Sequence, residues 1–144
     1  MGVFTKSVEE DLRLYPLLEE AIQNINDELE WIENKLEGVG SSNPSAFRSG
    51  GSDYNIVENS RAELITKKEK LADILKANEK EYILIKRGFK HLTDEQLEYI
   101  KLKYFENKSL REIARLKYTN KNDVASKLNK ALNKIISTRH GKGR

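Results

Sequence analysis

Apolar residues recur at alternating intervals of three and four positions through the first quarter of the chain, with acidic and amide residues between them. This spacing is that of a coiled-coil seam, in which the apolar side chains share one face of a helix. Tyr15-Pro16 predicts a kink or a restart at the beginning of the run, and Gly38 and Gly40 predict its end. The seam that follows Tyr15 consists of Leu18, Ile22, Ile25, Leu29, Ile32 and Leu36.

A second heptad pattern predicts another long helix, from about residue 56 to residue 88. Polar residues share its seam with the apolar ones. Residues 38–55 between the two helices are rich in Gly and Ser and predict a flexible loop. Two such helices can pair within one chain, between chains, or both. Because a two-helix layer alone has little core, we expect self-association through the first seam.

The last third of the chain predicts three shorter helices. Thr93 with Gln96, and Ser109 with Glu112, form the capping-box pattern that begins a helix. Asn120 is a suitable N-cap for the last helix, after a brief turn. Three helices with a tight connection between the last two match the helix-turn-helix plan.

These patterns together predict an all-α protein. Its residues 1–88 form a helical, coiled-coil oligomerisation region in which the two long helices fold as a hairpin around the 38–55 loop. Residues 89–144 form a three-helix helix-turn-helix domain with a basic tail.

Charge divides the chain near Lys86. Residues 1–85 contain 10 Lys and Arg against 17 Asp and Glu, a net charge of −7. Residues 86–144 contain 16 against 6, a net charge of +10. A basic block beside an acidic one indicates a polyanionic partner for one half only, although solvated helix faces are the plainer alternative.

The last predicted helix, about residues 121–137, carries a polar and basic face. Asparagine amides can pair with an adenine edge, and lysine can reach guanine or the phosphates. Lys121 and the residues after it include seven basic residues and one acid, Asp123, which suits the charge of DNA. A solvent-facing helix in a lysine-rich protein is the alternative. The candidate DNA-binding residues are Lys121, Asn122, Ser126, Lys127, Asn129, Lys130, Asn133, Lys134 and Arg139.

Residues 92–135 resemble region 4 of the sigma-70 family. The resemblance rests on Tyr-Phe-Glu at residues 104–106, Ser-x-x-Glu-Ile-Ala at residues 109–114 and Leu-x-x-Ala-Leu-x-Lys-Ile at residues 128–135. The turn departs from the family pattern, since Lys-Tyr-Thr-Asn at residues 117–120 replaces Leu-Gly, a hydrophobic residue and Ser. No equivalent of region 2 is visible.

Placed after an acidic, heptad-rich half, this domain makes the whole chain similar to the phage ArpU/RinA-type late transcription regulators. The resemblance implies a phage-encoded activator of late or packaging genes that acts in the cytoplasm of the bacterial host. Double-stranded DNA and further copies of the chain are then its expected partners, and RNA polymerase is a further candidate.

The sequence argues against an enzyme. No cysteine is present, which excludes thiolate catalysis, disulfides and cysteine-based zinc sites. His91 and His140 lack spaced acidic or histidine partners, and no phosphate-binding glycine loop occurs. No stretch approaches the roughly 18 apolar residues of a membrane span. We therefore expect no catalytic residue, metal, cofactor or membrane partner.

A sequence-specific DNA-binding transcription regulator is the main hypothesis. The small subunit of a terminase, which recognises a DNA packaging site, is an alternative with the same combination of parts. A coiled-coil adaptor whose basic domain binds protein is another. A dimer at a promoter favours the regulator, a ring of many subunits favours the terminase subunit, and the adaptor predicts no salt-sensitive DNA affinity.

Overall fold

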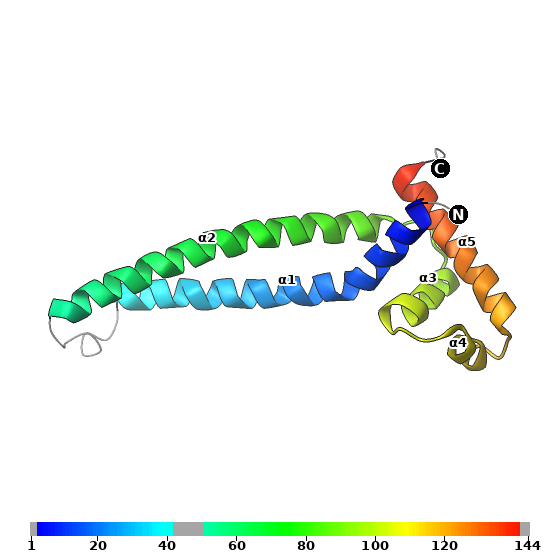
Figure 1. Ribbon diagram of the computed structural model, residues 1–144, viewed down its shortest axis with the longest axis horizontal. Coiled ribbons are helices and arrows are strands. Elements are labelled where there is room, and N and C mark those ends of the chain that lie inside the picture. The colour runs from blue at the N-terminus through cyan, green and yellow to red at the C-terminus, as the bar shows by residue number, and fades with distance from the viewer. Residues whose placement is uncertain (1–2, 42–50, 142–144) are drawn as a thin grey trace. The chain divides into compact units, whose positions relative to one another are not determined.

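The computed structural model describes residues 3–41 and 51–141, which form five α-helices and one short π-helical segment. No strand occurs among these residues, so the predicted all-α class is confirmed. None of their helices is long and apolar enough to cross a membrane. The elements, shown in Figure 1, are α1 (Val3–Ser41), α2 (Gly51–Arg87), α3 (Asp94–Ile100), the π-helical η2 (Lys101–Phe105), α4 (Leu110–Leu116) and α5 (Lys121–His140).

The described residues divide into two compact units, and both long helices contribute to each. The C-terminal unit contains the chain up to Glu19 and from Lys80 onward, and the two-helix unit is Glu20–Glu79. This division differs from the predicted one at residue 88. The first turns of α1 and the last two turns of α2 belong with the C-terminal helices.

In the two-helix unit, α1 and α2 run side by side in opposite directions (Figure 1). The predicted seam of α1 is the face that this pairing covers: Ile25 is 8% exposed and Ile32 is fully buried. Ile22, Leu29 and Leu36 are partly buried on the same face. These seam residues therefore pack within one chain, and self-association stays a prediction.

Polar contacts between the two helices explain why charged residues share the second seam. The guanidinium of Arg61 donates to the carbonyl oxygen of Leu36, with 3.1 Å between the atoms. Beside the seam, Lys67 forms an ion pair with Glu28 at 2.8 Å. Arg61 thus links the two helices through a backbone carbonyl of α1.

The loop between the long helices is shorter than predicted. Helix α1 continues past Gly38 to Ser41, and α2 begins at Gly51, earlier than the expected residue 56. Glycine in a helix costs only about 1 kcal/mol relative to alanine. The apolar contacts of the paired helices can offset that cost. Residues 42–50 of the predicted loop lie outside the described residues.

Helix α1 begins at Val3 and continues without interruption through Pro16, so the predicted restart does not occur. A proline inside a helix costs about 3 kcal/mol. Leu12 and Leu18 on either side of it are buried in the C-terminal unit, and their burial offsets this cost.

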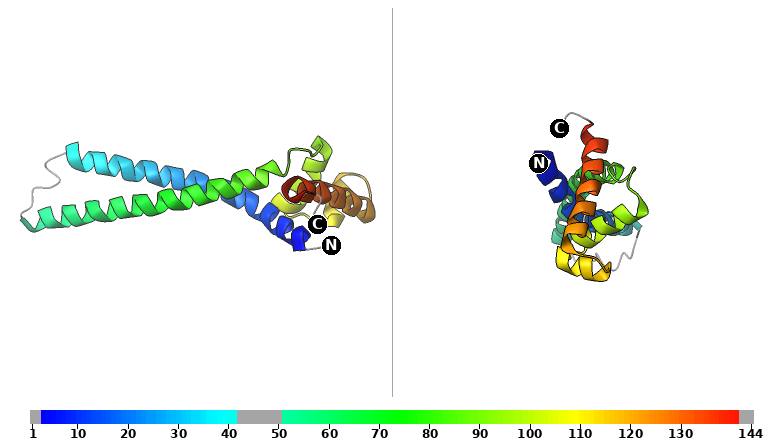
Figure 2. Two further views of the ribbon diagram at one scale, coloured as in Figure 1. Left: turned by 90° about the horizontal axis from the view of Figure 1, so that it is seen from above. Right: turned by 90° about the vertical axis from the view of Figure 1, so that its right-hand side faces the viewer.

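The core of the C-terminal unit joins residues from the two ends of the chain. Val8 and Leu12 of α1 are each 1% exposed and belong to the same apolar cluster as Ile113 and Val124. In every view the start of α1 lies beside the end of α5 (Figures 1 and 2). The buried face of α5 consists of Val124, Leu128, Ala131, Leu132, Ile135 and Ile136.

The π-helical segment η2 directs two aromatic residues toward the start of α1. Its wider turn is closed by a backbone hydrogen bond from Glu106 to Lys101. Buried Tyr104 donates its hydroxyl proton to Glu9, 2.7 Å away, and burial followed by this hydrogen bond raises the pKa of Tyr104. Phe105 stacks on Tyr15, with ring centroids 5.3 Å apart. The sequence pattern did not predict this π-helical turn.

Candidate nucleic-acid interface

Side-chain caps fix the beginnings of α3, α4 and α5, as predicted. Glu112 accepts a hydrogen bond from the backbone of Ser109, and the hydroxyl of Ser109 accepts one from the backbone of Glu112. The hydrogen bond from the backbone of Ser109, followed by the effect of the Ser109 side chain on the carboxylate, lowers the pKa of Glu112. Thr93 and Gln96 form the same reciprocal pair, and the side chain of Asn120 accepts from the third residue of α5.

A left-handed residue terminates α4. Tyr118 has a φ of 56°, and Thr119 donates its backbone proton to the carbonyl oxygen of Ala114 at 2.9 Å. The backbone of Tyr118 itself donates to Arg115. This is the Schellman arrangement, which usually has glycine at the left-handed position. It closes α4 within a four-residue connection and lets α5 begin immediately at Lys121.

The exposed face of α5 is a polar stripe that lies opposite its buried face. Its members recur at intervals of four, three and four residues, so they line up along the helix. All of them are exposed, and none forms an ion pair or a side-chain hydrogen bond within the described chain. The polar stripe consists of Asn122, Ser126, Asn129 and Asn133.

A row of three lysines flanks the polar stripe, and two of them are held by α3 and the segment before it. Lys127 forms ion pairs with Glu95 and Asp123, both at 3.4 Å. Lys134 donates to the carbonyl oxygen of His91 at 3.3 Å and to the side chain of Gln96 at 3.1 Å. The third lysine of the row, Lys130, is exposed and makes no ion pair with any described residue.

The surroundings of Lys127 favour its charged form. Partial desolvation is the largest single influence and lowers its pKa. The combined effect of Tyr99, Asp123 and Glu95 is larger, so the net result is a raised pKa. The ammonium group also lies over the Tyr99 ring, 5.5 Å from its centroid. Lys127 therefore has a structural role between α3 and α5 in addition to any contact with a ligand.

Arg139 is placed differently from the other candidate DNA-binding residues. Its guanidinium forms an ion pair with Asp11 of α1, and both side chains are only 19% exposed. The next residue, His140, stacks on Phe4 at 4.3 Å between ring centroids. Arg139 thus joins the end of α5 to the start of α1 and is not on the exposed face with the stripe.

A second group of cations, which the sequence analysis missed, lies on α4. Arg111 and Arg115 are exposed, and neither forms an ion pair within the described part of the chain. They line a groove together with the beginning of α5, including Lys121 and Asn122. Their spacing of four residues places them together on the face of α4 away from Ile113, which is a signal that the sequence itself contains.

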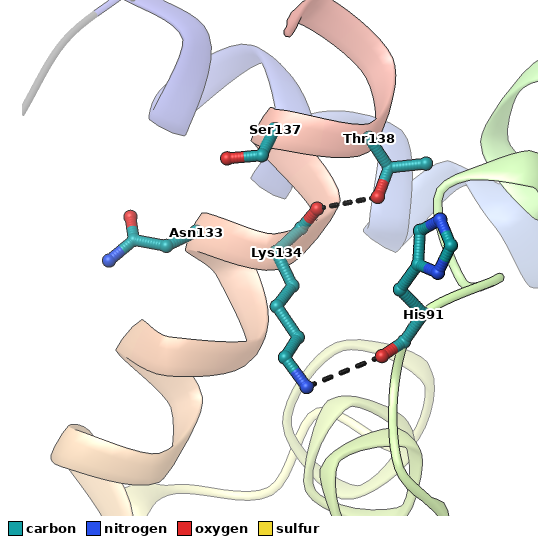
Figure 3. A pocket seen from close by; sticks show the side chains of 5 residues that line it. All are labelled: His91, Asn133, Lys134, Ser137 and Thr138. Atoms are coloured by element: carbon teal, nitrogen blue, oxygen red, sulfur yellow. Dashed lines mark hydrogen bonds between the residues drawn. The ribbon is translucent and has the colours of Figure 1, made fainter. Parts of the chain in front are cut away.

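The pocket in Figure 3 lies at the other end of α5. It is lined by His91, Asn133, Lys134, Ser137 and Thr138, and its hydrogen bonds run from Lys134 to His91 and from Thr138 back to Lys134. No carboxylate lines it. Across the described residues, no group of three or more His, Cys, Asp or Glu side chains could hold a metal ion.

Comparison of the chain with protein-family models, with curated proteins and with solved structures found no match.

Proposed function

We propose that this protein is a sequence-specific, DNA-binding transcription regulator. In this proposal α4 and α5 act as a helix-turn-helix, and the paired α1 and α2 form a helical hairpin. The observation that carries the proposal is the polar stripe of α5, which is exposed and has cations on both sides. Arg111 and Arg115 lie along one side of its first turn, and Lys130 lies in the row along the other.

The stripe suits the major groove of DNA, which admits an α-helix and presents a distinct pattern of donors and acceptors for each base pair. Asn122 and Ser126 are in the first two turns of α5, where a recognition helix contacts base edges. An asparagine amide can accept from and donate to an adenine edge at the same time. These two residues are therefore assigned to base recognition.

The flanking cations suit the phosphate backbone. Phosphate contacts fix the position of a protein on DNA and supply most of the salt-dependent affinity. Arg111 and Arg115 on α4, with Lys121 and Lys130 on α5, carry charges that no ion pair within the described residues compensates. The net charge of +10 over residues 86–144 acts in the same direction at long range.

The resemblance to phage late transcription regulators gives this proposal its biological setting. It favours a phage-encoded activator of late or packaging genes in the bacterial cytoplasm. The two-helix unit would then contact RNA polymerase or a second copy of the chain. Its exposed apolar side chains, including Trp31, Ile65 and Ile74, are candidates for such a contact.

The test is to capture DNA fragments of the phage and host genomes on the full-length protein at physiological salt and to sequence them. Enrichment of a discrete promoter-proximal segment supports the regulator. Enrichment at a packaging start favours the small terminase subunit instead. No enrichment, together with affinity that does not respond to salt, favours a protein-binding adaptor and contradicts the proposal.

A further inference from the structure

Tyr118 combines two unfavourable features at one position. Its φ of 56° places it in the left-handed region, where the Cβ atom of an L-residue crowds the following carbonyl oxygen. Its side chain is 97% exposed, so no burial compensates for the backbone conformation. Glycine would close α4 in the same way without this strain. The fold therefore explains the left-handed turn but does not explain a tyrosine in it.

Cationic residues lie close to Tyr118 in the sequence on both sides. Tyr118 precedes Lys121 by three residues and follows Arg115 by three. Arg111, Arg115 and Lys121 line the groove between α4 and α5, and no carboxylate of the described chain forms an ion pair with any of them. Tyr118 is not among the residues that line this groove, but it stands in the connection between α4 and α5, and its exposed phenol hydroxyl can donate a hydrogen bond to an anion that these cations attract.

We propose that Tyr118 is a DNA contact residue whose hydroxyl donates a hydrogen bond to a backbone phosphate at the edge of the groove that α5 enters. This inference rests on the proposed function and adds an uncharged phosphate contact to its cationic ones. The turn directly precedes the first residue of α5, so a tyrosine there reaches the backbone that borders the bases contacted by Asn122. Left-handed strain of this kind is characteristic of binding sites.

A protein partner could also use an exposed tyrosine beside arginines. The position of Tyr118 favours DNA, because Tyr118 lies in the connection between α4 and α5, and the groove between these helices includes Asn122 of the polar stripe. A phosphate contact of this kind positions the protein without reading sequence. The proposed contact should therefore affect binding to specific and random DNA equally.

The experiment measures the affinity of the full-length protein for a short random-sequence duplex across a range of salt concentrations. Tyr118→Phe removes the hydroxyl and keeps both the ring and the backbone strain. Tyr118→Gly removes the side chain and relieves the strain. Asn107→Gly is the matched control, because Asn107 is the other non-glycine residue with positive φ in the described chain, and it precedes α4 rather than following it.

We expect Tyr118→Phe to weaken binding about tenfold, as the loss of a hydrogen bond to a charged acceptor should. The slope of affinity against salt should stay unchanged, since no charge is lost. Tyr118→Gly should weaken binding at least as much while its midpoint of thermal unfolding does not fall. Asn107→Gly should bind like the unaltered protein.

If the unaltered protein binds DNA and both Tyr118→Phe and Tyr118→Gly bind it equally well, the assignment of Tyr118 is overturned. The DNA-binding proposal then stays intact. A loss with Tyr118→Gly alone would overturn the hydroxyl contact. Absence of salt-dependent binding by the unaltered protein would overturn both proposals.

Discussion

The carboxylate of Asp11 and the guanidinium of Arg139 form an ion pair across 128 positions of sequence. Both side chains are 19% exposed, so the pair is shielded from water more than an ordinary surface pair. The nearby hydrogen bond from Tyr104 to Glu9 joins the same turns of α1 to η2. The start of the chain is therefore an integral part of the C-terminal unit.

Asp11→Asn should lower the free energy of unfolding by about 1–2 kcal/mol, between the values typical of exposed and buried pairs. The cause is the loss of the partner of a half-buried guanidinium. Urea unfolding followed by circular dichroism measures the effect. Asp73→Asn, at an exposed position of α2, is the matched control and should have almost no effect. Equal effects of the two substitutions would contradict a specific pairing.

The same pair separates a structural role of Arg139 from DNA binding. Arg139→Gln and Asp11→Asn should lower stability to similar extents, and the double variant should be little worse than either, because the two residues share one interaction. Under conditions well below the midpoint of unfolding, both single variants should retain most of the DNA affinity. A large loss of affinity with Arg139→Gln alone would return this residue to the DNA-binding face.

Gly88 marks a close approach between α2 and α5. A Cβ atom at this position would lie 2.9 Å from the side chain of Ile135 and 3.2 Å from the carbonyl oxygen of Ile85. Gly88→Ala should therefore destabilise the protein by about 1–3 kcal/mol. Gly38→Ala is its control: a Cβ atom there meets nothing within 4 Å, so the better helix propensity of alanine should stabilise the protein by about 0.5–1 kcal/mol. Thermal unfolding of both variants measures these two changes in stability.

The features that the sequence predicted well are determined by neighbouring residues. The capping boxes at Thr93 and Ser109 form as expected, because each depends on two residues three positions apart. The seam of α1 is covered as expected, because a heptad spacing places its residues on one face whatever covers them. The polar stripe of α5 follows in the same way from helical periodicity.

The features that the sequence did not predict depend on partners far along the chain. The spacing of Val8 and Leu12 does not reveal that Ile113 and Val124, about a hundred residues later, complete their core. Arg139 and Lys127 appeared as basic residues of α5, and their carboxylate partners on α1 and α3 could not be inferred from composition. The division of the chain at residue 88 was misplaced for the same reason.

Lys130 and Lys127 give a paired test of the proposed DNA-binding face. Lys130→Gln should reduce the slope of log affinity against log salt by about one, since one phosphate contact is lost, and should leave thermal stability unchanged. Lys127→Gln should in addition lower the midpoint of thermal unfolding, because it breaks the ion pairs with Glu95 and Asp123. If neither substitution changes the salt slope, the lysine row does not contact DNA.

Ile32 and Trp31 are adjacent residues with opposite surroundings. Ile32 is fully buried in the two-helix unit, whereas Trp31 is 52% exposed. Ile32→Asp should destabilise that unit by more than about 3 kcal/mol, because it buries a charge without a partner. Trp31→Asp should cost less than about 1 kcal/mol. Unfolding monitored by circular dichroism compares the two.

The same two variants test how the protein self-associates. The seam is already covered within one chain, so we expect association to use exposed apolar residues such as Trp31 instead. Sedimentation should then show a lower mass for Trp31→Asp with its helical content retained. A mass that falls only with Ile32→Asp would support the original prediction that the seam joins subunits.

Glu112 gives the beginning of α4 a dependence on pH whose sign follows from its capping bonds. Its folded-state pKa is lowered from 4.5, chiefly by the hydrogen bond from the backbone of Ser109. The ionised carboxylate of Glu112 therefore stabilises the folded state above pH 4.5. This stabilisation is lost as the pH falls through the folded-state pKa of Glu112. Glu112→Gln preserves a capping box without a titrating group. We expect the variant to become more stable relative to the unaltered protein as the pH falls below 4.5, as measured by urea unfolding at a series of pH values. A constant difference across that range would mean that the carboxylate of Glu112 does not control this helix start.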